Sequence, residues 1–311
     1  MYSCCEDKLT IEKEKEVLSM LLPKFDYYEP QNMQEACKLI AKLKADAKII
    51  AGGTDLLVNM KNKKVSPKFL VSLAGISGLT DIEEKKKTFS IGSHAIVASL
   101  KESKVITSSF PALAEAAAVL GSPLVRNRAT IGGNIVTARP AADLVPALMV
   151  YDAKLVLASK DKKRETSLED FLVGPGETKI KPAEILTKIV LAAPPPHTGS
   201  SYIKLMHRRS LEIAIVAVAS RITLDKKDGI IKTAKIILSA VAPTAVHAVS
   251  AEKILIGQKP SEALFAQAAA SAMKDCKPIT DIRGGKAYRH AMVEVLTRRT
   301  LTAALKRAQG K

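Results

Sequence analysis

Two Gly-Gly loops constrain what this chain can fold into more than any other feature. The first lies in residues 51–57, AGGTDLL, after an apolar run at 48–50, and the second lies in residues 129–134, ATIGGN. Glycine adopts positive φ and leaves no Cβ between its N–H group and a ligand. Successive N–H groups then form a concave anion-binding site. Two converging loops could therefore hold the pyrophosphate of a dinucleotide.

Each loop taken alone has a simpler interpretation, since Gly-Gly after a strand often forms only a turn. Neither loop is a Rossmann fingerprint, because GxGxxG is absent, and neither is a P-loop, because no Gly-Lys-Ser/Thr follows. A ligand is favoured because each loop carries a threonine, Thr54 or Thr130, that suits phosphate or ribose. Asn134 and Asp143 add further hydrogen-bonding groups.

The composition excludes several function classes. The formal net charge is +17, but Lys and Arg are spread along the chain, aromatic residues are only 4% and Trp is absent. We therefore expect no nucleic-acid partner. No stretch approaches the roughly 20 apolar residues of a membrane-spanning helix, and the N-terminus lacks the apolar segment of a secretory signal. We expect a cytoplasmic protein without a membrane span.

Cysteine and histidine spacing argues against a metal on this chain. Cys4, Cys5, Cys37 and Cys276 form no CxxC pair, and none of the five histidines has metal-ligand spacing. We interpret the cysteines as reduced structural residues. No convincing acid–base pair lies near the glycine loops, so we assign no catalytic residue.

Hydrophobic periodicity predicts a chain that mixes helices and strands. The expected helices cover residues 32–43, 111–120, 143–150, 249–256, 261–273 and 285–307. The expected strands cover residues 48–50, 69–73 and 154–159, a hairpin over 80–91, and an antiparallel pair at 213–224 and 230–241. Residues 194–196, PPP, followed by Gly199-Ser200, are interpreted as an interior linker.

Several longer motifs follow one another along the chain. They are LPKFDYYEP (22–30), VRNRATIGGN (125–134), FLVGPGET (171–178), SYIK (201–204), VAPT (241–244) and DIRGG (281–285) with Tyr288-Arg289. In these motifs the chain resembles the FAD-binding medium subunit of the molybdenum hydroxylases, which include xanthine dehydrogenase and aerobic carbon monoxide dehydrogenase. Agreement in order over most of the chain is far more specific than any short pattern.

The resemblance implies an α+β fold. Two α/β subdomains would clasp FAD, as in vanillyl-alcohol-oxidase-type flavoproteins, and a C-terminal antiparallel sheet with helices would follow. The expected FAD-binding domain covers residues 21–195, with a small subdomain at about 21–75 and a larger one at about 76–195, and the C-terminal domain covers 200–311.

Residues 1–20 are expected to be an N-terminal extension. The codons of Lys15-Glu16-Val17 can contain a bacterial ribosome-binding sequence, so translation could start at Met20. The competing interpretation is a genuine short amphipathic helix.

The resemblance also implies the site. The expected FAD-binding residues are Ile50, Ala51, Gly52, Gly53, Thr54, Asp55, Leu56, Leu120, Thr130, Ile131, Gly132, Gly133, Asn134, Asp143, Leu186 and Lys204. The N–H groups of both Gly-Gly pairs would bind the pyrophosphate, the two threonine hydroxyls would bind phosphate, and Asn134 would brace its own loop. FAD would be non-covalent, because Thr54 and Asp55 stand where covalent relatives of this wider fold carry a histidine.

Three residues beyond the loops have separate implied roles. Asp143 would lie near the adenosine ribose, although it could equally cap the helix that it begins. Leu186 and Lys204 keep the family's spacing for flavin-ring contacts, and the lysine would stabilise negative charge on reduced flavin. Without the resemblance, Leu186 would be interpreted as core and Lys204 as solvated. Leu120 stands at an often aromatic position and would pack on the ring.

The implied function is electron transfer. A large partner subunit would carry the molybdenum cofactor and hydroxylate the substrate, and a small partner subunit would carry two-iron two-sulfur clusters. This chain would pass the electrons from FAD to NAD or another acceptor. The alternatives are a self-contained flavin-dependent oxidase or dehydrogenase of the same fold, disfavoured for want of a substrate domain, and an inactive structural subunit.

Overall fold

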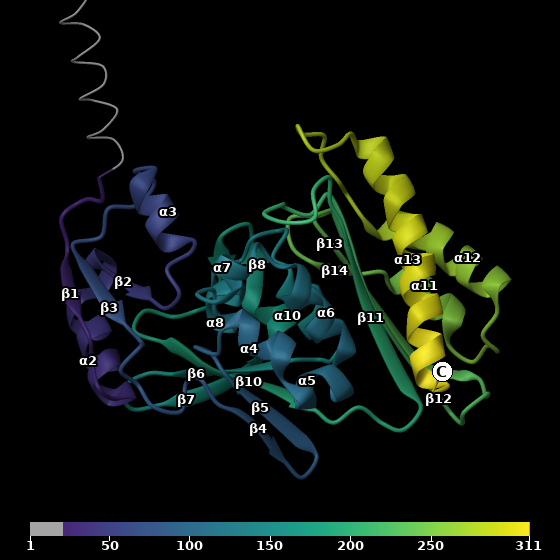
Figure 1. Ribbon diagram of the computed structural model, residues 1–311, viewed down its shortest axis with the longest axis horizontal. Helices are drawn as coiled ribbons and strands as arrows, with labels where there is room; N and C mark the ends of the chain where they lie inside the picture. The colour runs from purple at the N-terminus through teal and green to yellow at the C-terminus, as the bar shows by residue number, and fades with distance from the viewer. Residues whose placement is uncertain (1–20, 311) are drawn as a thin grey trace, which may run out of the picture.

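A computed structural model describes residues 21–310, in which three larger sheets with their helices follow one another along the chain (Figure 1). The expectations for the N-terminal extension fall on residues 1–20 and lie outside this range. We refer to the three parts as the N-terminal, middle and C-terminal units.

The N-terminal unit is a parallel three-stranded sheet, order β1-β3-β2, with one long helix against it. Its elements are β1 (Asp26–Tyr28), α2 (Met33–Leu43), a 3-10 turn (Lys44–Asp46), β2 (Ala47–Ile50), α3 (Leu56–Lys61) and β3 (Phe69–Ser72). Helix α2 starts where predicted, because the Asn32 side chain accepts a hydrogen bond from the Glu35 N–H at 2.9 Å. It buries Ala36, Cys37 and Ile40.

The middle unit is an antiparallel five-stranded sheet, order β4-β5-β10-β6-β7, with a layer of short helices on one side (Figure 1). Its strands are β4 (Ile82–Lys85), β5 (Thr88–Gly92), β6 (Lys154–Ala158), β7 (Lys163–Ser167) and β10 (Ile185–Ala192), with a small hairpin of β8 (Leu172–Gly174) and β9 (Glu177–Thr178). Its helices are α4 (Val97–Glu102), α5 (Lys104–Ser109), α6 (Pro111–Val119), α7 (Pro123–Arg126), α8 (Ile131–Val136), α9 (Leu144–Met149) and α10 (Leu168–Phe171). Phe110 anchors the core between Phe89 and Tyr151, with ring centroids 4.8 and 4.9 Å apart and edge-to-face geometry.

The C-terminal unit is an antiparallel sheet, order β11-β12-β13-β14, with three helices. Its elements are β11 (Thr198–Leu205), β12 (Val216–Leu224), β13 (Ile231–Ser239), β14 (Val246–His247), α11 (Val249–Leu255), α12 (Glu262–Ala272), a 3-10 turn (Met273–Asp275) and α13 (Lys286–Ala308). Side chains alternate across the sheet. Tyr202 and Ala217 join the core of the middle unit, whereas Val216 and Val218 join the core under the C-terminal helices. The sheet is therefore buried on both faces.

The predicted linker is only partly correct. The three prolines do connect β10 to β11, but Gly199 and Ser200 belong to β11 and are buried. A Cβ on Gly199 would lie 2.0 Å from the Ala304 carbonyl oxygen, so this glycine lets α13 approach the strand closely. Its role is packing and not flexibility.

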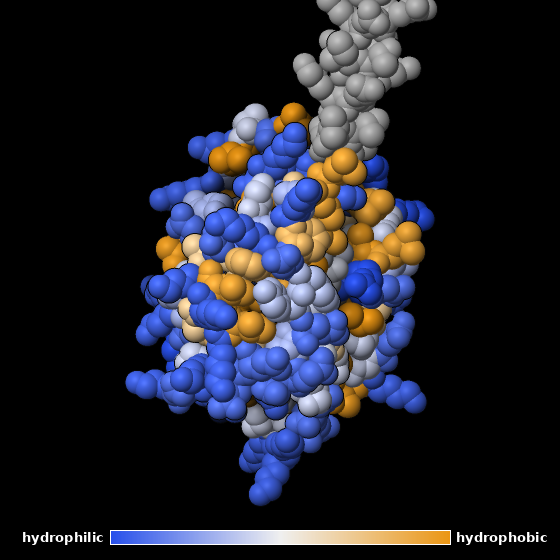
Figure 2. All heavy atoms as spheres, turned by 90° about the vertical axis from the view of Figure 1, so that its left-hand side faces the viewer, coloured by the Kyte–Doolittle hydropathy of each residue, from blue (hydrophilic) through white to orange (hydrophobic). Residues whose placement is uncertain are grey.

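The α+β architecture with a C-terminal sheet unit is confirmed. Figure 2 shows the face on the side of the N-terminal unit, where hydrophilic side chains predominate between scattered apolar patches. Among residues 21–310, no helix has the length and apolar character needed to cross a bilayer.

Candidate functional site

The first Gly-Gly loop lies between β2 and α3 and presents unpaired backbone donors. Within residues 21–310, the N–H groups of Gly52, Gly53, Thr54 and Asp55 have no hydrogen-bond partner. Gly53 has φ of +74°, a conformation that disfavours a side chain. Adjacent unpaired N–H groups with such a turn form an anion-binding nest. This loop therefore has the geometry expected for a phosphate site.

The second Gly-Gly loop uses its donors internally. Thr130 is the N-cap of α8, and its Oγ1 accepts a hydrogen bond from the Gly133 N–H at 3.1 Å. The Gly132 N–H donates to the Ser93 carbonyl at 2.8 Å. Both N–H groups therefore have partners within the chain here, and their binding of the pyrophosphate stays a prediction. The Thr130 hydroxyl, which accepts one bond here, keeps its hydrogen for donation.

The two loops approach each other through their glycines. A Cβ on Gly52 would lie 1.9 Å from the Arg128 carbonyl oxygen, so the first loop touches the backbone just before the second. A Cβ on Gly132 would lie 2.6 Å from the Ser93 carbonyl oxygen, whereas one on Gly133 would meet only the Thr130 Oγ1, at 3.0 Å. Gly52 and Gly132 are thus required by contacts within the chain.

Two adjoining cavities open over these loops. One of about 200 Å³ lies between the glycine loops, and one of about 930 Å³ extends toward the C-terminal unit. They share the lining residues Asp55, Leu120, Asn134 and Thr137. Ligand pockets are typically about 300–1,000 Å³. The joined space, with the nest at one side, fits a ligand of dinucleotide size.

Most of the predicted site residues line this space. They are Ala51, Gly52, Gly53, Thr54, Asp55, Leu56, Leu120, Thr130, Gly132, Gly133, Asn134, Asp143 and Leu186. Ile50, Ile131 and Lys204 line neither cavity. Ile131 is fully buried in the core of the middle unit, and Ile50 ends strand β2.

Asp143, Lys204 and Tyr202 form a buried hydrogen-bonded group. Lys204 Nζ lies 2.9 Å from Asp143 Oδ2, and the Tyr202 hydroxyl donates to Asp143 Oδ1 at 3.0 Å. The Lys204 side chain is only 1% exposed, so its interpretation as a solvated residue is wrong. Burial raises the pKa of Asp143, while Lys204 and Tyr202 oppose that rise.

These contacts also revise the expected roles of Asp143 and Asn134. Asp143 occupies the N-cap position of α9, but its side chain makes no capping hydrogen bond. The Asn134 Oδ1 accepts from the Leu144 N–H at 3.2 Å, so Asn134 braces the start of α9 and not its own loop. Asp143 and Lys204 touch each other, and the contacts expected of them with the ribose and with the flavin ring stay predictions.

Sequence reasoning missed three residues of this site. Thr137 lines both cavities, and Arg139 lines the larger one. Burial raises the pKa of Asp55, and the charge of Arg139 offsets part of that rise. Tyr202 could have been found, because it stands two residues before Lys204 in a strand and so shares its face. Nothing in the sequence places Arg139 opposite Asp55.

Among residues 21–310, no group of three or more His, Cys, Asp or Glu side chains is positioned for a metal ion. Two of the four cysteines, Cys37 and Cys276, lie within this range, and both are buried free thiols.

Comparison with known proteins gives the family. Residues 23–194 match the FAD binding domain in molybdopterin dehydrogenase, and residues 201–304 match the CO dehydrogenase flavoprotein C-terminal domain. The chain belongs to the FAD-binding medium subunits of the molybdenum hydroxylase family. It is an oxidoreductase subunit with an FAD-binding domain.

Curated relatives match this medium subunit over nearly their whole length. The 6-hydroxypseudooxynicotine dehydrogenase complex subunit alpha of Paenarthrobacter nicotinovorans is 33% identical, over 92% of this chain and 96% of the relative. The carbon monoxide dehydrogenase medium chain of Hydrogenophaga pseudoflava is 32% identical, over 92% and 98% respectively. The subunit and chain names show that such relatives belong to multi-subunit complexes.

Solved structures agree with the fold of the medium subunit. The chain superposes on carbon monoxide dehydrogenase from Hydrogenophaga pseudoflava, solved without the Mo-pyranopterin moiety of its molybdenum cofactor, with a TM-score of 0.89. The sequence identity is 33%, over 93% of this chain and 99% of that one. Quinoline 2-oxidoreductase from Pseudomonas putida 86 gives a TM-score of 0.88 at 28% identity, over 93% and 100%.

Proposed function

We propose that this medium subunit is the electron-transfer flavoprotein of a molybdenum hydroxylase. It receives electrons from two-iron two-sulfur clusters on a small partner chain and passes them to NAD or another acceptor. Substrate is hydroxylated at the molybdenum cofactor of a large partner chain. The relatives named as medium subunits support this division of labour.

One observation carries the proposal: within residues 21–310 the backbone N–H groups of residues 52–55 have no hydrogen-bond partner, and these residues line the two adjoining cavities over the glycine loops. Four successive unpaired N–H donors suit the pyrophosphate of FAD. The hydroxyls of Thr54 and Thr130 add two donors, one in each of the two adjoining cavities. Leu120 and Leu186 offer apolar contact for a flat ring. Bound FAD would supply reversible electron transfer.

The buried group beneath Leu120 supports the same proposal. Lys204 lies 3.4 Å from the Val119 carbonyl oxygen, so the lysine is held directly behind the turn that carries Leu120. Its charge is paired with Asp143 at 2.9 Å. We infer that this buried group fixes the position of Leu120 and the electrostatic potential on the side of the cleft where the flavin ring packs. Asp143 itself lines the larger cavity.

The cytoplasm is the proposed location. Buried free thiols at Cys37 and Cys276 are compatible with a reducing compartment.

The test compares the FAD-loaded chain alone with the chain assembled with its two partner chains. Alone, it should oxidise NADH with an artificial dye as acceptor and hydroxylate no substrate. In the assembled complex, substrate added without oxygen should bleach the flavin absorption. Substrate oxidation by the isolated, molybdenum-free chain would contradict the proposal and favour a self-contained flavin oxidase.

A further inference from the structure

The side chain of Ser93 is buried without a hydrogen-bond partner. Ser93 is 4% exposed, and its Oγ contacts no donor or acceptor among residues 21–310. A buried polar group left unpaired destabilises a protein, so nearly all such groups in native structures have a partner, which can be water or a ligand. The Ser93 hydroxyl therefore needs a partner from outside these residues.

Ser93 directly follows β5, in a segment that supports the second Gly-Gly loop. Its carbonyl accepts from the Gly132 N–H at 2.8 Å, and its own N–H donates to the Thr187 carbonyl of β10 at 2.9 Å. Next to this pair, the Ile131 N–H donates to the Ala95 carbonyl at 3.0 Å. A Cβ on Gly132 would lie 2.8 Å from the Ser93 Cβ, so the side chain lies against the loop. The backbone of Ser93 is thus fixed beside the second loop, and only its hydroxyl is left without a partner.

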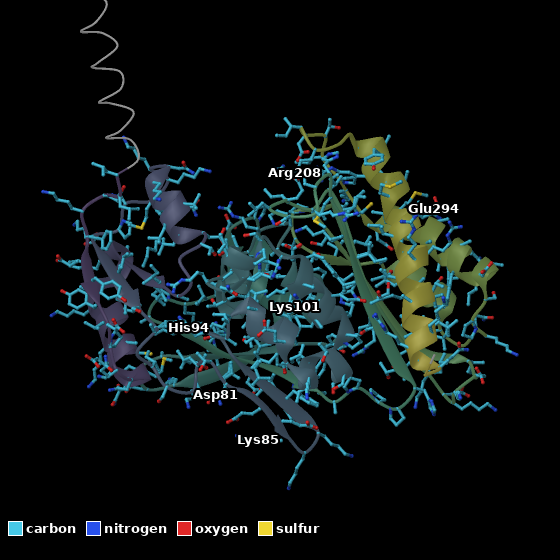
Figure 3. All side chains as sticks on the ribbon, viewed as in Figure 1. Asp81, Lys85, His94, Lys101, Arg208 and Glu294 are labelled. Carbon is cyan, nitrogen blue, oxygen red and sulfur yellow. The ribbon has the colours of Figure 1, made fainter. Side chains whose placement is uncertain are left out.

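The segment that carries Ser93 lies where the N-terminal and middle units meet. The next residue, His94, lies between these two units (Figure 3), and its N–H donates to the Leu79 carbonyl at 2.8 Å. Leu79 packs in one core cluster with Ala36 and Cys37 of α2. Ser93 is therefore held at the junction of the two units that are expected to clasp FAD.

The cavity of about 200 Å³ between the glycine loops is lined by Ser93. Among residues 21–310, no other residue with a buried, unpartnered side-chain atom lines this cavity or the larger one. A serine side chain has three staggered positions about one bond, so its hydroxyl can turn toward a ligand in the cavity. Thr130 lines the same cavity, and its hydroxyl also keeps a hydrogen for donation. Side-chain donors are therefore available at the loop whose own N–H groups have partners within the chain.

We propose that the Ser93 hydroxyl donates a hydrogen bond to a pyrophosphate oxygen of bound FAD. The inference rests on the proposed function, because it takes FAD as the ligand of this cavity. An ionised phosphate oxygen accepts hydrogen bonds more strongly than a neutral group, and it suits a hydroxyl that has a hydrogen to donate and no acceptor. The first loop then contributes backbone donors from residues 52–55, and the second contributes the hydroxyls of Thr130 and Ser93.

The test compares Ser93→Ala with the wild-type full chain, each freed of flavin and titrated with FAD by the change in flavin fluorescence. The variant should bind FAD about tenfold more weakly or worse, because it loses a hydrogen bond to a charged group. Without FAD it should melt no lower than the wild type, because alanine leaves no polar atom unpaired. Added FAD should raise its melting temperature less than that of the wild type.

Phosphorus-31 NMR of the FAD-loaded chain reports the contact itself. At least one of the two phosphorus signals of bound FAD should move in Ser93→Ala, because the hydrogen bond to an oxygen on that phosphorus is gone. A purely structural role of Ser93 would not move these signals.

Ser220→Ala is the matched control. Ser220 is 0% exposed, its Oγ lies 2.7 Å from the Thr300 Oγ1, and it lines neither cavity. This variant should melt lower than the wild type with and without FAD, because a buried hydrogen bond is lost. It should bind FAD as the wild type does and leave both phosphorus signals in place.

Three results would contradict the inference at different levels. Wild-type FAD affinity and unmoved phosphorus signals in Ser93→Ala would overturn the role of Ser93, assign water as its partner and leave the proposed function standing. Weaker FAD binding with both phosphorus signals unmoved would place the hydroxyl against another part of FAD and overturn the pyrophosphate contact. A wild-type chain that binds no FAD would contradict the proposed function itself.

Discussion

Replacing Lys204 by methionine should be among the most damaging single changes to this protein. The Lys204 and Asp143 side chains are 1% and 9% exposed and lie 2.9 Å apart. Removing the lysine leaves a buried carboxylate whose one remaining side-chain donor among residues 21–310 is the Tyr202 hydroxyl. Breaking a buried ion pair in this way costs about 3–5 kcal/mol. At about 2–4 °C per kcal/mol, the melting temperature should fall by about 6–20 °C.

The stability lost in Lys204→Met should be larger at high pH than at low pH. Burial raises the pKa of Asp143, and Lys204 opposes that rise, so the pKa should climb further in Lys204→Met. A carboxyl with a raised folded-state pKa binds more protons folded than unfolded, so stability falls as pH rises through that pKa. The variant should therefore lose most stability relative to wild type at about pH 8 and less toward about pH 5.

Urea unfolding followed by circular dichroism measures these effects. Lys204→Met combined with Asp143→Asn should be more stable than Lys204→Met alone, because the buried charge is gone. Lys68→Met is the matched control: it breaks the exposed Lys68–Asp46 pair, whose lysine is 71% exposed, and should cost less than about 1 kcal/mol. The reasoning is refuted if Lys204→Met is no more damaging than this control, or if its deficit grows on acidification.

Three further changes test other parts of the structure. Gly52→Ala should reduce flavin retention and lower the melting temperature, since its Cβ would lie 1.9 Å from the Arg128 carbonyl; Gly133→Ala, which meets only the Thr130 Oγ1, should cost far less. Gly199→Ala should destabilise the C-terminal unit in thermal unfolding, because its Cβ would lie 2.0 Å from the Ala304 carbonyl. The pKa of His247 is raised mainly by its hydrogen bond to Glu252, so its stabilisation is complete below about pH 6.5 and lost as pH rises through the higher folded-state value. An NMR titration should show that raised pKa, and His247→Gln should flatten the stability profile above about pH 6.5.

The sequence predicted those parts of the fold that local chemistry determines. Asn32 caps α2, Pro111 opens α6, and the two long strands β12 and β13 pair as expected. Gly199 was misassigned because glycine in a polar, proline-rich context is typical of a linker. Only the tertiary approach of α13 shows that the missing side chain makes room for a helix.

The candidate site was also predicted from the sequence only in part. The glycine loops were found because their composition is unusual, but which N–H groups stay free depends on neighbours distant in sequence, such as Ser93 beneath Gly132. Lys204 was expected in solvent on local grounds, because nothing nearby in the chain shows that Asp143 and Tyr202 enclose it. The pairing of charged residues far apart in the chain, such as Lys204 with Asp143, could not be predicted from the sequence.

The cofactor released by the purified protein tests the central claim most directly. The account predicts that acid precipitation frees unmodified FAD into the supernatant at one equivalent per chain, because the nest and the joined cavities suit a dinucleotide held without a covalent bond. Mass spectrometry and the absorption spectrum identify the flavin. Recovery of FMN, flavin retained in the precipitated protein, or a chain that binds no flavin when FAD is supplied would contradict it.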